Sequence, residues 1–535
     1  MQKVTNGKYN KDKNDEASQT LYAQTQNRTN NFLSGVTASY FTQSAILVAG
    51  FFLTPFLLRK VGSGQYGWWL LANQFLGYLS LLDLGVLEML PREVAYLTGK
   101  SIKRELSKNS PEFIELVQNV FALTLFQSIL MSVIAVIAWY FLPSTWSEVK
   151  NPLLLSLSIY ILLFPFRIFE SVLQGLQDIR FICSMRALAW LLGSLLTFFM
   201  VIYRPIIYSL IIGWGINQLF FTTVSARRFF KWFPDLKILR HSLPKLSFSR
   251  PYLRRSIWLS LGQISQIFLN GTDLTIVGSL SGPAAVSAYA STGKLLETLS
   301  NKPLVLMQSA VPGLSEIRYR DFGRLATVMS SLTQLMLLCS GAVACLVLAI
   351  NETFVIWWVG PKLFGGVSLT VFLVINMIIR HWATTQVYTV FCLGREREMT
   401  VVGVLDGLVT LILSILFCRH WGVIGVPIGS ILSVCIISGP ALLLVVQSEF
   451  STSLRQIIIS YIPWLSRLAI VAPLSHIVGR YSRDFGIYGL VLATISVVVL
   501  YTAIMLPLVK DGVLREYIIP RLEKFSIKKF LEGRA

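Results

Sequence analysis

Charged residues are scarce in this chain. They make up 14% of its 535 residues, whereas soluble globular domains contain about 25%. Hydrophobic residues reach 54% and the mean hydropathy is +0.63. This composition excludes an ordinary soluble domain and predicts a protein that crosses a membrane many times.

The sequence also lacks the cysteine patterns of disulfide frameworks and zinc sites. Its six cysteines lie in or beside apolar segments without Cys-x-x-Cys spacing. We therefore expect no metal site and no other cofactor. The first thirty residues are polar and have no short apolar centre of the kind that marks a secretory signal, so a polar cytoplasmic tail is expected at 1–30.

Long loops outside the membrane are missing as well. The longest predicted outer loop, residues 351–366, contains a single acid, Glu352. Membrane polymerases and ligases of glycan assembly usually need a larger loop, so a non-enzyme is expected, although an error in the topology would reopen that alternative. The GxGxxG match at 62–67 lies in an outer hairpin rather than between a strand and a helix, which argues against a nucleotide site.

Apolar segments of about 20 residues recur along the chain, each long enough to cross a hydrocarbon core of about 30 Å. They predict an all-α integral membrane protein with about fourteen transmembrane helices. The expected spans are approximately 33–58, 66–91, 113–142, 152–174, 184–203, 205–224, 256–280, 285–312, 326–350, 366–393, 400–417, 423–447, 459–479 and 487–508.

The basic residues predict the orientation of these spans. The net charge is +20, and most of the 47 Lys and Arg residues fall in the tails and in alternate loops. By the positive-inside rule, both termini are then cytoplasmic. Anionic membrane lipids account for the excess positive charge, so we expect no binding of nucleic acid.

A basic loop predicts how the spans are grouped. Residues 225–255 carry nine Lys and Arg residues against one Asp, between the sixth and seventh spans. Glycines at corresponding positions suggest a parallel repeat with an offset of 218 to 219 residues. The expected division is a cytoplasmic tail at 1–30, an N-terminal lobe at 31–224, a basic cytoplasmic linker at 225–255, a C-terminal lobe at 256–447, and two added helices with a basic cytoplasmic tail at 448–535.

Several spans carry one polar stripe each. Since polar stripes facing lipid are unfavourable, they predict a shared hydrated cavity, with hydrogen bonding between helices as the alternative. The stripes are Gln263, Gln266, Asn270 and Asp273; Ser287, Ser291, Lys294, Glu297 and Asn301; Asn376, Arg380, Thr384 and Tyr388; and Ser156, Tyr160, Arg167, Ser171 and Gln174.

Charges of both signs occur inside the spans. Bases at mid-depth bind phosphate through charge-assisted hydrogen bonds, but acids are equally frequent, so the predicted cavity is mixed in charge. It suits an amphiphile that bears phosphate and sugars. The bases are Arg167, Arg186, Lys294, Lys302, Arg380 and Arg467, and the acids are Asp83, Glu88, Glu170, Asp273, Glu297 and Asp406.

The second span is unusual because it ends in a cluster of charges. Asp83 is expected about 25 Å down this helix, at the inner mouth of the cavity. Glu88 and Arg92 have the i, i+4 spacing of an ion pair, which favours a structural or gating role. Pro91 removes a helical hydrogen bond, so a kink is expected there.

Two stretches carry a family resemblance. "FLTPFLLRKVGSGQYGWWLLANQFLGYLSLLDLGVLEMLPREVA" at 52–95 and "LGREREMTVVGVLDGLVTLILSILFCRHWGVIGVPIGS" at 393–430 resemble the polysaccharide transporter family. This family, which includes O-antigen and oligosaccharide-lipid flippases, belongs to the multidrug, oligosaccharidyl-lipid and polysaccharide flippase superfamily. The resemblance implies two six-helix lobes in a V around a central cavity, plus two C-terminal helices, in a bacterial-type cytoplasmic (inner) membrane.

The resemblance also implies a function. Alternating access would flip a polyprenyl-pyrophosphate-linked oligosaccharide, with coupling to H⁺ or Na⁺ and contact with polysaccharide-assembly proteins left open. A cation-coupled exporter of drugs or small molecules from the same superfamily is the main alternative. On the flippase reading, substrate contacts are expected at Arg167, Lys294, Arg380, Asn270 and Asn376, and coupling or gating residues at Asp83, Asp273, Glu297, Glu88 and Arg92. Lys294→Ala and Arg380→Ala are then expected to reduce flipping at an unchanged protein level.

Overall fold

The computed structural model describes residues 37, 39–100, 111–142, 146–234, 236, 246–320, 322–450 and 453–511. All regular secondary structure in these residues is helical. The expected tail at 1–30, part of the basic linker and most of the C-terminal tail lie outside them. The chain divides into two compact units: the first comprises residues 1–61 and 78–260, and the second comprises 62–77 and 261–535.

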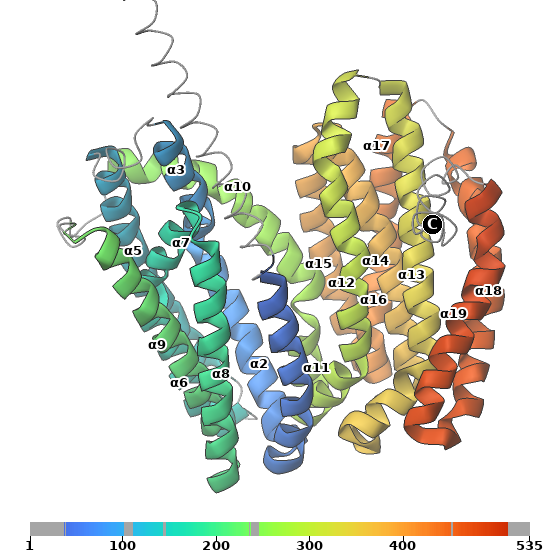
Figure 1. Ribbon diagram of the computed structural model, residues 1–535, viewed down its shortest axis with the longest axis horizontal. Helices are drawn as coiled ribbons and strands as arrows, with labels where there is room; N and C mark the ends of the chain where they lie inside the picture. Colours follow the sequence, from blue (N-terminus) through green and yellow to red (C-terminus); the bar gives the residue numbers. More distant parts are fainter. Residues whose placement is uncertain are drawn as a thin grey trace, which may run out of the picture. The chain divides into compact units, whose positions relative to one another are not determined.

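The first unit is built from helices whose long apolar runs match the first six predicted spans. Figure 1 shows them from blue to green. They are the helix Ser39–Val61, the end of α2 (Ser63–Ser80), a 3₁₀ turn at Leu81–Asp83, α3 (Val86–Lys100), α5 (Pro111–Phe141), α6 (Ser147–Leu163), a 3₁₀ turn at Phe164–Arg167, α7 (Ile168–Gly175), α8 (Ile179–Tyr203), α9 (Ile207–Trp232) and the first part of α10 (Leu246–Asn270).

The second unit contains the remaining spans together with most of α2. Gln74 of α2 donates a hydrogen bond to the carbonyl of Gly271, and Ser287 donates one to the carbonyl of Ser63. Its helices are the end of α10, α11 (Asp273–Ser281), α12 (Pro283–Arg320), α13 (Phe322–Val359), α14 (Val367–Cys392), α15 (Glu396–Trp421), α16 (Gly425–Ser433), a π turn at Val434–Ser438, α17 (Gly439–Phe450), α18 (Leu454–Ser482) and α19 (Gly486–Asp511).

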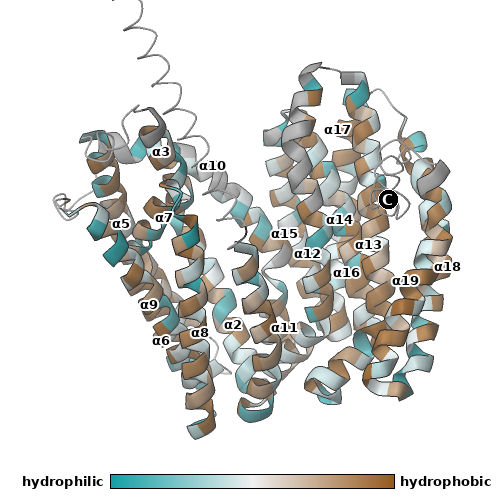
Figure 2. Ribbon diagram, in the orientation of Figure 1, coloured by the Kyte–Doolittle hydropathy of each residue, from teal (hydrophilic) through white to brown (hydrophobic). Residues whose placement is uncertain are grey.

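The outer helices expose apolar side chains. In Figure 2 brown residues predominate along α8 and α19, whereas teal residues interrupt α12. On α19 the side chains of Val491, Leu492, Ile495, Val498 and Val499 are all more than half exposed. Such a continuous apolar face belongs in contact with lipid.

The predicted membrane spans are confirmed as helices. Nine helical stretches in the described residues are long and apolar enough to cross a membrane, and a bent pair in 63–97 makes a tenth. Two of the nine, Arg397–Phe450 and Leu454–Leu508, each hold two predicted spans. The seventh predicted span is helical at 246–270 and 273–281 and the eighth at 283–320, but neither is among the stretches that pass the same test. The chain is thus an all-α integral membrane protein.

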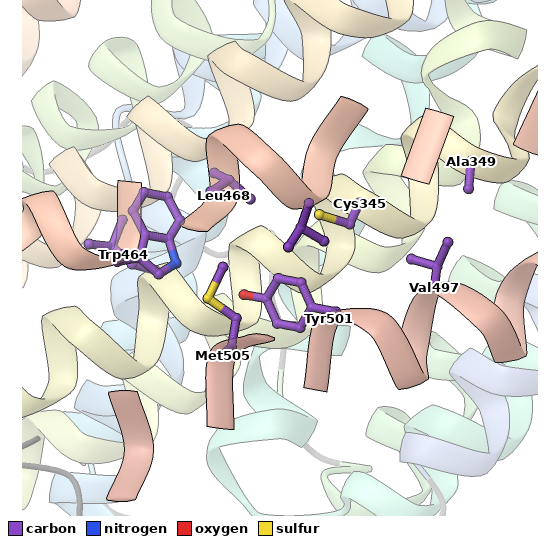
Figure 3. Packing of buried hydrophobic residues seen from close by; sticks show 9 residues of the cluster. Cys345, Ala349, Trp464, Leu468, Val497, Tyr501 and Met505 are labelled. Carbon is purple, nitrogen blue, oxygen red and sulfur yellow. The ribbon is translucent and has the colours of Figure 1, made fainter. Parts of the chain in front are cut away.

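The two added helices are packed into the second unit. α18 and α19 lie beside α13 (Figure 1), and their apolar residues meet as shown in Figure 3. Gly479 of α18 lies so close to α13 that a Cβ there would be 1.9 Å from the Ala349 carbonyl oxygen. The buried cluster between these helices contains Leu337, Cys345, Ala349, Trp464, Leu468, Val471, Val497, Tyr501 and Met505.

Candidate functional site

Four of the predicted spans are interrupted within the described residues. Irregular backbone at membrane depth is tolerated only where it is buried in protein or lines water, so these positions are the first candidates for a site. Each interruption carries a polar side chain: Asp83 at the end of a 3₁₀ turn, Arg167 at the end of another, Asp273 at the start of α11, and Ser438 at the end of the π turn.

Asp83 caps the second half of a broken helix. Its carboxylate oxygens accept hydrogen bonds from the Leu87 N–H, at 3.1 and 3.2 Å. The free N–H groups at a helix start attract a carboxylate both by hydrogen bonding and through the helix dipole. The buried Gln127 amide donates to the Asp83 carbonyl oxygen at 2.8 Å. The Asp83 carboxylate therefore stabilises the start of α3.

The break lies at Leu84 and Gly85. These residues have φ angles of 50° and 69°, a left-handed region in which glycine is favoured, and the helix bends by 51° there. α3 continues as one helix through Pro91, so the kink expected at that proline stays a prediction.

Arg167 lies exposed in the first unit. Its Nη1 donates to the Tyr160 hydroxyl at 3.0 Å, and its guanidinium carbon is 5.6 Å from the centre of that ring. Glu170, one turn on, forms its ion pair with Arg186 on α8 instead. Tyr160 supplies no negative charge, so Arg167 keeps donors for an anionic ligand.

Arg380 is held by a buried network in the second unit. Its Nη1 donates to Asp406 Oδ2 at 2.6 Å, and its Nη2 donates to the Thr410 hydroxyl at 2.8 Å. Nε and Nη2 both donate to the Ser430 hydroxyl, at 3.0 and 2.9 Å. The side chains of Arg380 and Asp406 are only 14% and 3% exposed. The arginine expected to contact substrate is thus neutralised inside the protein.

Asp406 is saturated with donors. Besides Arg380, the Ser438 hydroxyl donates to its Oδ2 at 2.6 Å, and the Ser433 hydroxyl donates to its Oδ1 at 2.6 Å. Thr410 also donates to Oδ1, at 3.3 Å. A buried carboxylate is tolerated when its charge is paired and its oxygens are hydrogen-bonded.

The π turn brings two serines to that carboxylate. Residues five apart in an α-helix point about 140° away from each other, because each residue turns the helix by about 100°. The turn at Val434–Ser438 instead closes with the Gly439 N–H donating to the Val434 carbonyl, an i to i+5 bond. This wider turn allows both Ser433 and Ser438 to reach Asp406.

Close packing of α15 against α16 makes the network possible. A Cβ on Gly425 would lie 2.2 Å from the Phe417 carbonyl oxygen, and one on Gly429 would lie 2.4 Å from the Ser414 backbone nitrogen. Only glycine fits such an approach. The "GVPIGS" stretch thereby brings Ser430 within reach of Arg380.

Asp273 is held by its neighbour on α12. Its Oδ2 accepts a hydrogen bond from the buried Tyr289 hydroxyl at 3.0 Å. The expected polar stripe of the seventh span is not one continuous helical face, because α10 ends at Asn270 and α11 begins at Asp273. The side chain of Asn270 lies outside the described part of the structure.

Lys294 and Glu297 form an exposed ion pair on α12. The Lys294 Nζ lies 3.0 Å from Glu297 Oε2, and the two side chains are 49% and 65% exposed. Lys294 is about 17 Å along the helix from Pro283, and charges at such depth are costly against lipid. This face of α12 is therefore suited to water or to a polar ligand.

The other predicted site residues fall into two groups. The Asn376 side-chain oxygen accepts from the Ser430 hydroxyl at 2.8 Å, so it belongs to the Arg380 network. Glu88 and Arg92 are both exposed on α3, and their expected ion pair stays a prediction.

The network contains residues that the sequence did not single out. Asp406 was recognised only as one of several interior acids, and the hydroxyls of Thr410, Ser430, Ser433 and Ser438 were not selected. A lone carboxylate in the apolar run "VVGVLDGLVTLIL" was the available signal. Among the described residues, no group of three or more metal-binding side chains comes together.

Comparison with known proteins shows the fold. No family model matches the sequence, and no curated protein matches it. Among solved structures, the chain is similar to the lipid II flippase MurJ in an inward closed conformation. The identity is 15%, the match covers 89% of this chain and 99% of that one, and the TM-score is 0.65.

A second solved structure is similar over a large part of the chain. It is a multidrug resistance MATE family transporter of the MOP superfamily in an inward-facing conformation. The identity is 14%, the match covers 75% of this chain and 95% of that one, and the TM-score is 0.52. The chain therefore has a helical fold in common with a lipid II flippase and with a multidrug resistance transporter.

Proposed function

We propose that this protein is a flippase that translocates a polyprenyl-pyrophosphate-linked oligosaccharide, such as a polysaccharide or O-antigen repeat unit, across the cytoplasmic membrane by alternating access. The likeness to a flippase of a lipid-linked substrate over 89% of the chain supports a related architecture. On this proposal both termini are cytoplasmic, and the lobe division expected from the basic linker applies.

The observation that carries the proposal is the exposure of charges on membrane-length helices. Lys294 and Glu297 are about half exposed or more on α12, and Arg167 is exposed in the first unit. Lipid would not solvate them, whereas a water-filled path would. A soluble head group that crosses such a path meets charges of both signs.

Each of these residues has a role in the proposal. Arg167 in the first unit and Lys294 in the second each offer charge-assisted hydrogen bonds to the pyrophosphate as it crosses, and Glu297 positions the Lys294 ammonium group while accepting hydrogen bonds from sugar hydroxyls. The polyprenyl chain stays in the bilayer because its transfer into water would be unfavourable. Arg380 acts through its network with Asp406 and keeps α14, α15 and α16 in register.

The energy source is part of the proposal. A gradient of H⁺ or Na⁺, the membrane potential or consumption of the product drives net transport, with Asp83 and Asp273 as the candidate coupling carboxylates. Both sit at helix interruptions inside the span, where a change in protonation or in a bound cation alters the local helix geometry. Assembly proteins that use the flipped product are the expected partners.

The leaflet distribution of the lipid-linked oligosaccharide tests this function. Cells that lack the protein are treated from outside with a membrane-impermeant reagent that modifies sugars, and complemented cells serve as the reference. We expect complete intermediates to be protected in the inner leaflet until the full chain is restored. A Lys294→Ala chain at normal protein level is expected to restore labelling poorly.

Normal labelling of single repeat units in the deleted cells would overturn the flippase assignment. A simultaneous gain in susceptibility to cationic drugs would then favour the exporter, whose fold is also shared. Labelled single units without longer glycan would instead favour a polymerase or ligase.

A further inference from the structure

A cavity outside the candidate site lies between α13, α18 and α19. Its volume is about 270 Å³, and it is lined by Gln334, Leu337, Tyr461, Trp464, Arg467 and Leu508, among others. This is below the roughly 300–1,000 Å³ of sites for drug-sized ligands. It has room for about nine waters by liquid volume, or for a small head group with its adjoining carbons.

The wall of this cavity contains an unsatisfied cation. Arg467 Nη1 is buried and has no hydrogen-bond partner among the described residues. A buried charged donor without an acceptor is costly, more so than a neutral one. An anionic group in the cavity would supply the missing acceptor, and a phosphate matches the planar guanidinium well.

The cavity extends from near the middle of α18 toward one end of the two helices. Arg467 is thirteen residues from the start of α18 at Leu454, or about 20 Å, and Leu508 is three residues from the end of α19 at Asp511. Side chains on a helix lean toward its N-terminus, so Arg467 leans toward this same end. On the topology predicted from the basic residues, the cytoplasmic membrane surface with its phosphate groups lies at this end.

The surroundings are apolar rather than aqueous. Ile458, Ile459, Ile462 and Leu465 of α18 are each about half exposed and flank the cavity-lining residues in sequence. Figure 3 shows that the neighbouring interior is also apolar, since Leu468, Val497 and Met505 belong to its buried cluster. The natural occupant of such a site therefore has a hydrocarbon chain as well as a negative charge.

We propose that this cavity binds an anionic glycerophospholipid of the surrounding bilayer, with Arg467 paired to its phosphate and its acyl chain along α18. The inference does not depend on the transported substrate, since the cavity is lined by the two added helices and α13. A bound phospholipid would stabilise the packing of these three helices, because it would fill a space that their side chains leave open.

Native mass spectrometry of the purified full chain tests the proposal. The protein is titrated separately with phosphatidylglycerol, phosphatidylcholine and a polyprenyl phosphate. We expect phosphatidylglycerol to bind most tightly, and Arg467→Met to weaken that binding by at least about tenfold. Arg419→Met, an exposed arginine on α15 outside the cavity, is the matched control and should bind as the parent does.

Three outcomes would overturn the proposal: equal binding of phosphatidylcholine, equal binding by Arg467→Met, or selective binding of the polyprenyl phosphate. The last would assign the cavity to the carrier of the transported substrate instead. If Arg467→Met does not fold, Leu508→Trp fills the cavity while leaving the guanidinium in place. That variant is expected to lose the same phospholipid, and retention of it would also contradict the proposal.

Discussion

Arg167 and Arg380 both lie on the fourth predicted span of their half of the chain, yet their surroundings differ. Arg380 is 14% exposed and donates to Asp406, Thr410 and Ser430. Arg167 is exposed, and its hydrogen-bond partner is the neutral Tyr160 hydroxyl. The same residue type at a similar depth is thus a structural element in one unit and an available cation in the other.

The neighbouring helix makes this difference. On the fifth span of the second half, α15 presents Asp406 to Arg380. On the fifth span of the first half, α8 presents a base, Arg186, which takes Glu170 as its partner. In the described part of the structure Arg167 forms no ion pair, and its side chain is exposed.

A second pair of corresponding sites differs in the sign of the charge. Asp178, before α8, pairs with Arg228 at 3.0 Å, whereas Arg395, before α15, pairs with Glu449 and Glu398. The preceding residues, Gln177 and Gly394, have nearly equal left-handed φ angles of 63° and 71°. Hydrogen bonds to Glu398 and Glu449 also raise the pKa of the Arg395 guanidinium. The two halves keep the backbone turn and exchange the charges.

The largest expected effect follows from removing Arg380. Arg380→Ala leaves Asp406 buried without its counter-charge, so the free energy of unfolding should fall by about 3–5 kcal/mol. Thermal unfolding of the purified protein in detergent measures this, with Arg167→Ala as the control. Contrary to the expectation from sequence, the amount of protein should fall along with flipping.

The double variant Arg380→Met with Asp406→Asn sharpens this test. It removes both charges and keeps one acceptor oxygen, for Ser433 or for Ser438, while the new NH2 group can donate to the hydroxyl oxygen of the other serine. It should therefore be more stable than Arg380→Ala alone. Equal melting temperatures for Arg380→Ala and Arg167→Ala would remove the distinction between the two arginines.

Charge reversal at the exchanged ion pairs should have a smaller effect. Asp178→Arg places two cations together and should destabilise the chain by about 1 kcal/mol, and adding Arg228→Asp should recover most of the loss. Arg395→Glu with and without Glu449→Arg is the parallel cycle. Thermal unfolding at low and high salt measures both, and salt should shrink the effect. No recovery in either double variant would mean that these pairs do not stabilise the turns.

Arg167→Ala should change stability by no more than about 0.5 kcal/mol, as is usual for exposed sites. Its flipping rate should nevertheless fall by about tenfold or more, because a charge-assisted contact to substrate is lost. Flipping is followed by outer-leaflet labelling at matched protein levels. Arg167→Lys, which keeps the charge but not the planar fork, should fall in between. A full rate in Arg167→Ala would show that this exposed cation does not contact substrate.

The smallest change in stability is expected at the exposed pair on α12. Exchanging it, with Lys294→Glu and Glu297→Lys together, should alter the unfolding free energy by less than about 0.5 kcal/mol. The flipping rate should still drop, since the cation moves nearly one turn along α12. Lys302→Ala, also exposed on this helix, is the control for a general effect of charge. Equal rates for the exchanged and parent chains would argue against a positioned contact.

The predicted repeat is visible in particular backbone residues. Gly62 and Gly282 have φ angles of 87° and 85° and precede the second helix of each half, and Gln177 and Gly394 precede the fifth. Their separations, close to 220 residues, resemble the offsets suggested by glycines in the sequence. Turn residues keep their position because the chain must reverse there, whatever the side chains nearby.

The sequence by itself determined that this is a multi-span helical membrane protein. Runs of about 20 apolar residues must be helical in lipid, because every backbone polar group needs an internal partner there. It also placed charges inside the spans, since their cost makes them conspicuous. These are local properties, and they can be read one segment at a time.

Only the tertiary structure decided what those charges do. Arg380 and Asp406 are 26 residues apart, and Ser438 is another 32 residues on; their meeting depends on two glycines that let helices approach and on a π turn. The carboxylate of Asp83 caps a helix that begins three residues later. Whether a charge is paired or available depends on the residues that neighbouring helices place beside it. The spacing of residues along a single helix does not reveal them.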